Sequence, residues 1–365
     1  MKIALIYNFA QHYRTNIFML MDQEMDIDFY FGDHYLNVKK MDYSLLKHKV
    51  TEVKNIKFGP FVWQSNTIKL AWANYDTYIM LGEPMCLSSW FVLILSRILG
   101  KRFYFWTHGW YGREGWVKRL IKKVYFGLAN GTMLYGEYAR KIMLSQGFSA
   151  KKLAVIHNSI AYDTQIALRQ ELKESFIFRN HFCNDYPNIV FIGRLTEVKK
   201  LDQILLSQSI CKADGCLFNV TFIGEGAMET KLKELAKTLN LEKFVWFYGP
   251  SYDEKELSQL LYCADLCVAP GNIGLTAMHA MTFGCPCISH NDFKWQMPEF
   301  EAIQEGVTGA FFERDNTEDL AKVIMEWLDK HKGDREQVQD ACFKEIDDNW
   351  NPHKQIEVIK KMVGL

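Results

Sequence analysis

The stretch that decides the fold class runs Ile189-Val190-Phe191-Ile192-Gly193-Arg194-Leu195-Thr196-Glu197-Val198-Lys199-Lys200. It opens with an apolar run of strand-forming residues, turns at a glycine and then supplies two cations. Similar short apolar runs recur along the chain, separated by longer segments of helical period, which is typical of parallel α/β layers. The expected strands are 3–7, 27–31, 78–81, 103–106, 132–135, 154–156, 189–192, 220–223, 244–248, 266–269, 287–289 and 310–312.

These strands form two series, one in each half of the chain, and each series is long enough for a doubly wound parallel sheet. A chain of 365 residues, 48% of them apolar, provides material for two domains. Residues from about 160 to 187 lose the strand pattern and turn polar, which suits an interdomain connection. The predicted domains are residues 1–168 and 169–349. An amphipathic helix at about 350–365 can pack on either half, including back on the first domain.

Charge and hydropathy exclude several classes of protein. Lys plus Arg and Asp plus Glu both number 43, so no overall basicity points to nucleic acid. The longest apolar stretch, 90–95, is far shorter than the roughly 18 residues of a spanning helix. The first residues are typical of a strand and not of a signal peptide. Nine scattered cysteines without ligand spacing favour a reduced, cytoplasmic compartment and predict no metal site.

Candidate ligand-binding residues follow the strands, because open parallel sheets bind ligands beyond the carboxyl ends of their strands. Arg194 and Lys199 follow one strand, and two cations near one point suit a doubly charged phosphate or a diphosphate. The plain alternative is a pair of solvated surface cations. Gly224-Glu225-Gly226 follows the next strand and indicates that something approaches the backbone closely, although it lacks the third glycine of a dinucleotide fingerprint.

The loop after strand 266–269 is the most informative of these strand ends. Gly271 and Gly274 free the backbone, and a helix that opens around Leu275 presents unpaired N–H groups to an anion. Thr276 adds a hydroxyl in the first helical turn, and His279 is expected to face the same cleft. The alternatives are a simple tight turn and a core histidine.

The first half has comparable strand ends. His108, Arg113 and Glu114 crowd together with several glycines after strand 103–106, which favours a role in a cleft over a plain loop. Asn8-Phe9-Ala10-Gln11-His12-Tyr13-Arg14 follows the first strand and can line the same cleft from another side. We therefore take His12, Arg14, Arg113 and Glu114 as acceptor-side candidates.

Together these motifs resemble those of the nucleotide-sugar glycosyltransferases of family 4. The first half matches this family only through its strand rhythm, His108 and Ile156-His157-Asn158. The second half matches in order and at family spacing through Gly193-Arg194-Leu195 with Lys199, Gly224-Glu225-Gly226, Tyr248-Gly249, Cys263-Ala264-Asp265-Leu266, Gly274-Leu275-Thr276, Ala280-Met281, Gly284-Cys285-Pro286, Pro298-Glu299 and Gly306-Val307-Thr308-Gly309.

The resemblance implies a GT-B fold, in which two Rossmann-like parallel-sheet domains face each other across a cleft. It also implies sugar transfer from a nucleoside diphosphate donor with retention at the anomeric carbon, without a metal or other cofactor. Arg194 and Lys199 would hold the diphosphate, and His108 would contact the donor sugar near the reacting carbon; these three are the catalytic candidates. The donor-binding candidates are Asn8, Gly193, Gly224, Glu225, Gly271, Asn272, Gly274, Leu275, Thr276 and His279.

One departure from the family separates this sequence as a variant subgroup. The family carries two glutamates eight residues apart around this loop, where this chain has Gly271 and His279. In one explanation His279 contacts the ribose or a phosphate, and Asn272 with backbone amides contacts the sugar. In the other, the donor site has decayed into a binding subunit. The retained cations and helix start favour the first explanation, since buried charge is unfavourable without a ligand.

Residues 113–126 combine Lys118, Arg119, Lys122 and Lys123 with large apolar side chains. A basic amphipathic helix of this kind suits the surface of an anionic bilayer, and the alternative is a helix with a solvated face. The predicted acceptor is a glycan or polyprenyl-linked glycan of a cell-surface polysaccharide, met at the inner face of the cytoplasmic membrane.

Two other functions remain open. An epimerase or hydrolase of nucleotide sugars would need acid–base carboxylates, for which Glu225, Glu114 and Glu299 are the candidates in these motifs. A catalytically silent carbohydrate-binding subunit would turn over no donor.

Overall fold

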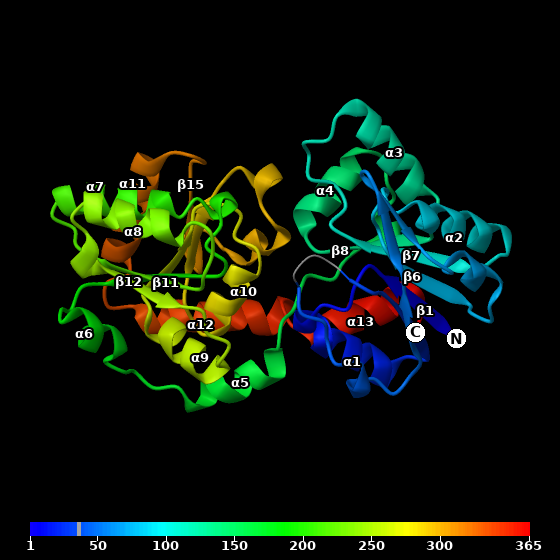
Figure 1. The fold of residues 1–365 in the computed structure, drawn as a ribbon, viewed down its shortest axis with the longest axis horizontal. Coiled ribbons are helices and arrows are strands. Elements are labelled where there is room, and N and C mark those ends of the chain that lie inside the picture. The colour runs from blue at the N-terminus through cyan, green and yellow to red at the C-terminus, as the bar shows by residue number, and fades with distance from the viewer. Residues whose placement is uncertain (35–37) are drawn as a thin grey trace. The chain divides into compact units, whose positions relative to one another are not determined.

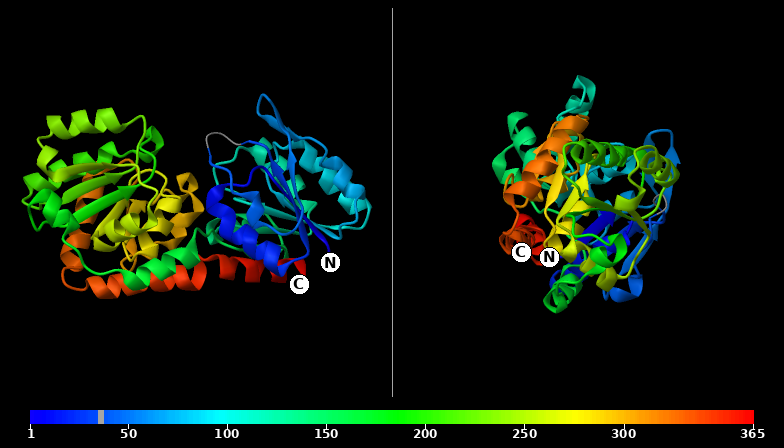
Figure 2. Two further views of the ribbon diagram at one scale, coloured as in Figure 1. Left: turned by 60° about the horizontal axis from the view of Figure 1, so that its bottom comes forward. Right: turned by 90° about the vertical axis from the view of Figure 1, so that its left-hand side faces the viewer.

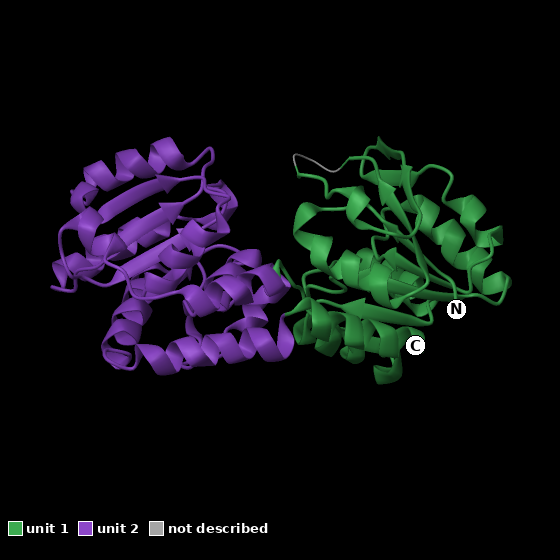
Figure 3. Cartoon of the chain, turned by 90° about the horizontal axis from the view of Figure 1, so that it is seen from below, with its two compact units in different colours: residues 1–161, 351–365 green, residues 162–350 purple. Residues whose placement is uncertain are grey.

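The computed structural model describes residues 1–34 and 38–365 and divides them into two compact units. Unit 1 comprises residues 1–161 and 351–365, and unit 2 comprises residues 162–350 (Figure 3). The division falls at residue 161, and not at the expected residue 168, because the helix Tyr162–Glu171 (α5) is bound within unit 2. Its Arg169 guanidinium pairs with the Asp347 carboxylate at 2.8 Å.

Unit 1 contains a parallel sheet with the strand order β3-β2-β1-β6-β7-β8-β9. Helices cover both of its faces, as apolar strands buried on two sides require (Figure 1). The strands are β1 (Ile3–Tyr7), β2 (Ile27–Gly32), β3 (Val50–Val53), β6 (Thr77–Leu81), β7 (Arg102–Thr107), β8 (Gly131–Leu134) and β9 (Leu153–Val155). The helices are η1 (His12–Arg14), α1 (Thr15–Glu24), η2 (Tyr43–Leu45), η3 (Ile68–Trp72), α2 (Leu87–Ile98), α3 (Trp116–Gly127), α4 (Glu137–Ser145), η4 (Ala150–Lys152) and α13 (Pro352–Val363).

The terminal helix α13 belongs to unit 1 although it follows unit 2 in the sequence. Asn351 caps its start by accepting the Lys354 N–H, and Pro352 occupies the first turn, where no N–H is needed. Ile356, Ile359 and Val363 enter the same apolar core as α1. In Figure 2 the red terminal helix accordingly lies beside the blue first helix.

Unit 2 contains a second parallel sheet with the order β12-β11-β10-β13-β14-β15, which is the 3-2-1-4-5-6 order of doubly wound folds. Its strands are β10 (Asn188–Ile192), β11 (Asn219–Ile223), β12 (Val245–Gly249), β13 (Leu266–Ala269), β14 (Cys287–His290) and β15 (Gly309–Phe312). The other elements are α6 (Ile177–Phe182), η5 (Glu197–Lys199), α7 (Asp202–Ala213), α8 (Glu229–Thr238), η6 (Glu242–Phe244), α9 (Glu254–Cys263), α10 (Leu275–Thr282), η7 (Phe293–Trp295), η8 (Pro298–Ala302), α11 (Thr317–Lys330) and α12 (Arg335–Asn349).

Every strand predicted from an apolar run is present within a residue or two of the expected bounds. The prediction missed β3 and the antiparallel hairpin of β4 (Asn55–Phe58) and β5 (Phe61–Gln64). β4 is largely exposed, β3 and β5 are mostly half-buried, and all three mix apolar with polar residues, so they lack the continuous apolar run of a buried parallel strand. None of the helices in the described residues has the length and apolar character that crossing a bilayer requires.

Candidate functional site

The loops after β10 and β11 pack backbone against backbone, and glycine makes this contact feasible. A Cβ atom on Gly224 would lie 2.0 Å from the Gly193 carbonyl oxygen, and one on Gly226 would lie 2.3 Å from the Leu195 oxygen. The Leu195 N–H donates to the Glu225 carbonyl at 2.9 Å. The candidates Gly193, Gly224 and Glu225 therefore lie together, and Glu225 is exposed.

Lys199 lies at the end of η5, and Asn272 holds its ammonium group. Lys199 Nζ donates to the Asn272 carbonyl oxygen at 2.6 Å and to Asn272 Oδ1 at 2.9 Å. The pKa of Lys199 is lowered to about 8, chiefly by burial; the Glu299 carboxylate raises it and the Arg194 charge lowers it. Arg194 is exposed and near enough to act on Lys199, so the two predicted cations do lie near each other.

The start of α10 is fixed by buried polar contacts. Gly274 precedes the helix with φ at +54°, a conformation that favours glycine. The Thr276 hydroxyl donates to the Ile192 carbonyl at 2.9 Å, and this hydrogen bond connects the start of α10 to β10. The Ile273 N–H donates to Gln296 Oε1 at 3.0 Å. The N–H groups of the first helical turn are the part of this helix that is suited to an anion.

His279 is half-buried on α10, one turn after Leu275, which is also half-buried. The other residues of the helix are buried. His279 and Leu275 therefore share the one partly exposed face of α10, where a side chain can reach a ligand.

In unit 1, His108 follows β7 and packs among aromatic rings. Its ring centroid lies 4.7 Å from that of Tyr135 and 6.0 Å from that of Tyr111. Burial lowers the pKa of His108 to about 4, and the charges of Arg14 and Lys122 contribute to the shift. The imidazole is therefore neutral at pH 7, with a buried Nδ1 that has no hydrogen-bond partner among the described residues.

Glu114 organises the loop that follows His108. Its carboxylate accepts the N–H groups of Tyr111 and Gly112, both at 2.9 Å, and the Lys122 ammonium at 2.7 Å. Lys122 also donates to the Gly109 carbonyl at 2.8 Å. Burial alone would raise the pKa of Glu114, but the hydrogen bonds from Lys122 and Tyr111 outweigh it and lower the pKa. Lys122 was expected on the membrane-facing surface of a helix. In the structure it instead contacts the loop that follows β7.

The acceptor-side candidates occupy different environments. Arg14 is buried, with its guanidinium 5.1 Å from the Tyr135 ring and 5.6 Å from the Trp106 ring, so it lies near His108. His12 is exposed, and its Nδ1 lies 3.3 Å from the Lys39 carbonyl. The Arg113 guanidinium is 5.0 Å from the Tyr111 ring.

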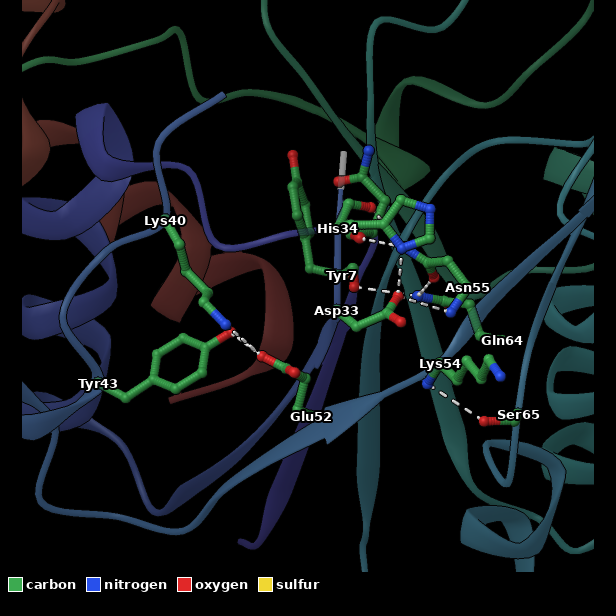
Figure 4. A network of polar contacts seen from close by, with 11 residues as sticks. Tyr7, Asp33, His34, Lys40, Tyr43, Glu52, Lys54, Asn55, Gln64 and Ser65 are labelled. Atoms are coloured by element: carbon green, nitrogen blue, oxygen red, sulfur yellow. Dashed lines mark hydrogen bonds and ion pairs between the residues drawn. The ribbon is translucent and has the colours of Figure 1, made fainter. Parts of the chain in front are cut away.

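Polar side chains of the β4–β5 hairpin, Asn55 and Gln64, point toward Tyr7 at the end of β1 (Figure 4), and Asn55 also binds the backbone of Asn8. Asn55 Nδ2 donates to the Asn8 carbonyl at 2.8 Å, and Gln64 Nε2 donates to the Tyr7 carbonyl at 3.1 Å. The unpredicted hairpin therefore fixes one of the predicted residues.

Comparison with known proteins finds a family model that matches most of unit 2. Residues 173–342 match the family model described as "Glycosyl transferases group 1". The matched residues cover most of unit 2 and none of residues 1–161, and the recognisable motifs lie in the same half of the sequence.

One curated relative is the amylovoran biosynthesis glycosyltransferase AmsK of Erwinia amylovora, which is 28% identical over 174 residues. That match covers 45% of this chain and 41% of AmsK, which is less than half the length of either protein. The sequence similarity to AmsK therefore extends over a stretch about as long as one domain.

Solved structures match over the whole chain. The apo form of the lipopolysaccharide outer core galactosyltransferase WaaB has a TM-score of 0.73 at 16% identity and covers 100% of this chain and 99% of its own. Anabaena Alr3699/HepE in complex with UDP has a TM-score of 0.72 at 14% identity and covers 100% of both chains. The expected GT-B fold with two Rossmann-like units is thereby confirmed.

Within unit 2, the structure brings together Arg194, Lys199, Gly271 and Asn272. The sequence predicted that Asn272 contacts the donor sugar. It did not predict the contact between the Asn272 side chain and Lys199 that the structure shows. It also missed Gln296, which donates to Ser289 Oγ at 2.8 Å and accepts the Ile273 N–H. No motif marks these partners, because they depend on how loops distant in sequence pack. Among the described residues, no cluster of His, Cys, Asp or Glu side chains has the arrangement of a metal site.

Proposed function

We propose that this chain transfers a sugar from a nucleoside diphosphate donor to a glycan or lipid-linked glycan acceptor. The observation that carries the proposal is the Lys199 ammonium, held by two neutral oxygens of Asn272 beside the loop that opens α10. The hydrogen bonds to Asn272 orient the ammonium group without adding negative charge, and the Glu299 carboxylate is the main acidic influence on Lys199. Arg194 adds a second cation nearby, and the first turn of α10 adds N–H groups.

These groups suit the departure of a diphosphate. Negative charge grows on the leaving group in the transition state, and fixed positive charge stabilises that state more than the ground state. In this proposal Arg194 and Lys199 supply the counter-charge that a metal supplies in other enzymes. The reaction proceeds with retention at the anomeric carbon, as the family resemblance implies.

His108 and His279 have separate roles in the proposal. His108, with its pKa lowered to about 4, is a neutral hydrogen-bonding group for a donor-sugar hydroxyl. His279 contacts the ribose or a phosphate from the partly exposed face of α10. The sugar and the base of the donor are set by these contacts.

A panel of nucleotides tests the donor class. UDP, GDP, ADP and CMP are added separately, and the midpoint of thermal unfolding is recorded, because a ligand that prefers the folded state raises it. We expect one diphosphate to raise the midpoint most and Lys199→Ala to abolish that rise. A chain stabilised by none of the four contradicts the proposal.

Product analysis separates transfer from the alternatives. An epimerase changes its nucleotide sugar without an acceptor, and a silent binding subunit changes none. The Glu114 carboxylate, one candidate acid–base group for an epimerase, is already occupied by Lys122 and two backbone N–H groups. We therefore expect donor consumption to depend on added acceptor extract.

We also propose that α3 meets the surface of an anionic membrane at the cytoplasmic face, where a lipid-linked acceptor would be presented. Trp116 is 75% exposed and Leu120 is 58% exposed. No acidic residue occurs between Glu114 and Glu137. The exposed cations of the helix are Lys118, Arg119 and Lys123. Apolar side chains beside uncompensated cations are typical of helices that lie in the interface of anionic bilayers.

Sedimentation with vesicles tests the membrane contact. Vesicles containing phosphatidylglycerol should sediment the unaltered chain at low salt, and Trp116→Ser should reduce that fraction several-fold. Tyr252→Ser is the matched control, because Tyr252 is 88% exposed in unit 2. Equal sedimentation of the two variants, or none of the unaltered chain, contradicts the proposed contact.

A further inference from the structure

Two consecutive lysines of unit 2 differ in the groups that their ammonium nitrogens contact, although the charge of the Glu299 carboxylate also raises the pKa of Lys199. The Lys200 ammonium pairs with the carboxylate of Asp315, which cancels its charge. The Lys199 ammonium contacts only neutral oxygens, namely the carbonyl at 2.6 Å and the amide Oδ1 at 2.9 Å of Asn272. A neutral acceptor orients an ammonium group without compensating its charge, whereas a carboxylate does both.

Asn272 is brought to Lys199 by close packing of the two loops. The Gly271 N–H donates to the Lys199 carbonyl at 3.0 Å. A Cβ atom at position 271 would lie 2.1 Å from the Val198 carbonyl oxygen, so only glycine fits this approach. On the other side of the loop, the Ile273 N–H is bound by Gln296. Asn272 is thus fixed between two anchored residues, and its side chain reaches Lys199 from a defined backbone.

The geometry leaves Lys199 ready for an anion. An ammonium group has three N–H donors, and Asn272 takes two of them. The third has no protein acceptor among the described residues. We propose that Asn272 is a positioning residue that orients the Lys199 ammonium and preserves its charge, so that the free N–H meets the diphosphate of the donor. This inference rests on the proposed function and identifies a residue on which that function depends.

Asn272→Asp provides the sharpest test. The substitution keeps an oxygen in reach of Lys199 but adds the negative charge that Asp315 gives to Lys200. Isothermal titration calorimetry would compare whichever of UDP, GDP and ADP binds the unaltered chain with the corresponding uncharged nucleoside. We expect Asn272→Asp to weaken diphosphate binding about tenfold or more, which is about 1.4 kcal/mol or more, because a carboxylate at contact distance offsets the charge of the ammonium group. Nucleoside binding should change by less than about twofold.

Asn272→Ala keeps the backbone carbonyl contact and should weaken diphosphate binding about threefold, between the unaltered chain and Asn272→Asp. Asp315→Asn, which changes the charge beside Lys200, is the matched control and should stay within about twofold. If Asn272→Asp does not fold, judged by its thermal unfolding, the loss in Asn272→Ala decides the question.

The outcomes are distinct. Unchanged diphosphate affinity in the Asn272 variants overturns the inference and leaves the proposed function standing. A parallel loss of nucleoside affinity also overturns it, because that pattern indicates a structural role only. An unaltered chain that binds none of the three diphosphates contradicts the proposed function itself, and this inference with it.

Discussion

The strand-end loops of the two units use similar residues in opposite ways. After β7 of unit 1, Lys122 and Glu114 neutralise each other at 2.7 Å and fix the loop that carries His108. After β10 of unit 2, Lys199 is held at a similar distance by neutral oxygens and keeps its charge. Under the proposed function, the partner of a cation, and not its position after a strand, separates a loop-forming lysine from one that binds a ligand.

The largest effect, a loss of turnover, is expected when one of the two cations of the proposed diphosphate site is removed. Lys199→Ala and Arg194→Ala should each lower turnover by about a hundredfold or more, since loss of one diphosphate contact in the transition state costs on the order of 3 kcal/mol. Release of nucleoside diphosphate in the presence of acceptor extract measures the loss. Unfolding midpoints close to that of the unaltered chain would show that the fold is kept, and near-normal turnover in both variants would overturn the comparison.

The next largest effect, a loss of stability, is expected when a side chain at position 271 blocks the close approach of the two loops. Gly271→Ala introduces a Cβ atom 2.1 Å from the Val198 oxygen, so the loop must move and separate Asn272 from Lys199. Such overpacking destabilises by about 1–3 kcal/mol, measured by urea unfolding. Gly127→Ala is the control, because nothing lies within 4 Å of its Cβ position. A Gly271→Ala variant as stable as Gly127→Ala would show that the contact is not needed.

In unit 1 the corresponding prediction concerns stability. Glu114→Gln removes the charge that balances Lys122 and should destabilise the chain by about 1–3 kcal/mol at pH 7, measured by denaturant unfolding. Because the pKa of Glu114 is lowered in the folded state, its contribution is present above its ordinary pKa near 4.5 and is lost as the pH falls through the lowered value. The variant and the unaltered chain should therefore converge in acid.

Glu229→Gln is the control for this prediction, since it removes the carboxylate of the exposed pair with Lys233 and should have no measurable effect. Equal effects of Glu114→Gln and Glu229→Gln would remove the contrast between a loop-forming and a surface ion pair.

The smallest effect is a pH dependence of ligand binding. The protonated form of Lys199 binds an anion, and its pKa is lowered to about 8, so diphosphate affinity should fall up to about tenfold between pH 7 and pH 9. Lys199→Arg stays charged in this range and should show no such fall. A pH-independent affinity in the unaltered chain would show that Lys199 does not titrate at the site.

Much of the fold follows from the sequence because buried parallel strands have continuous apolar runs. Ile189–Ile192 and Leu266–Ala269 illustrate this, and the exposed hairpin Asn55–Gln64, which lacks such a run, was missed. The site was predicted in part for a related reason. Arg194 and Lys199 are marked by their place after a strand, whereas Asn272 as the partner of Lys199 depends on packing between segments 73 residues apart.

The same limit applies to Lys122. Its sequence neighbours are the cations and apolar residues of an amphipathic helix, so the pattern assigned it to the membrane-facing surface. Its actual partner, Glu114, lies eight residues earlier, across the turn at Gly115 that precedes α3. A loop that folds back onto a helix has no periodic signature, which is why the contact could not be read from the sequence.

A crystal structure of the chain with the nucleoside diphosphate that stabilises it most would test the central claim directly. We expect a phosphate oxygen within hydrogen-bond distance of Lys199 Nζ and of an N–H in the first turn of α10, with Asn272 still bound to the ammonium group. A diphosphate bound elsewhere, or a Lys199 side chain turned away from it, would show that Lys199 does not bind the donor.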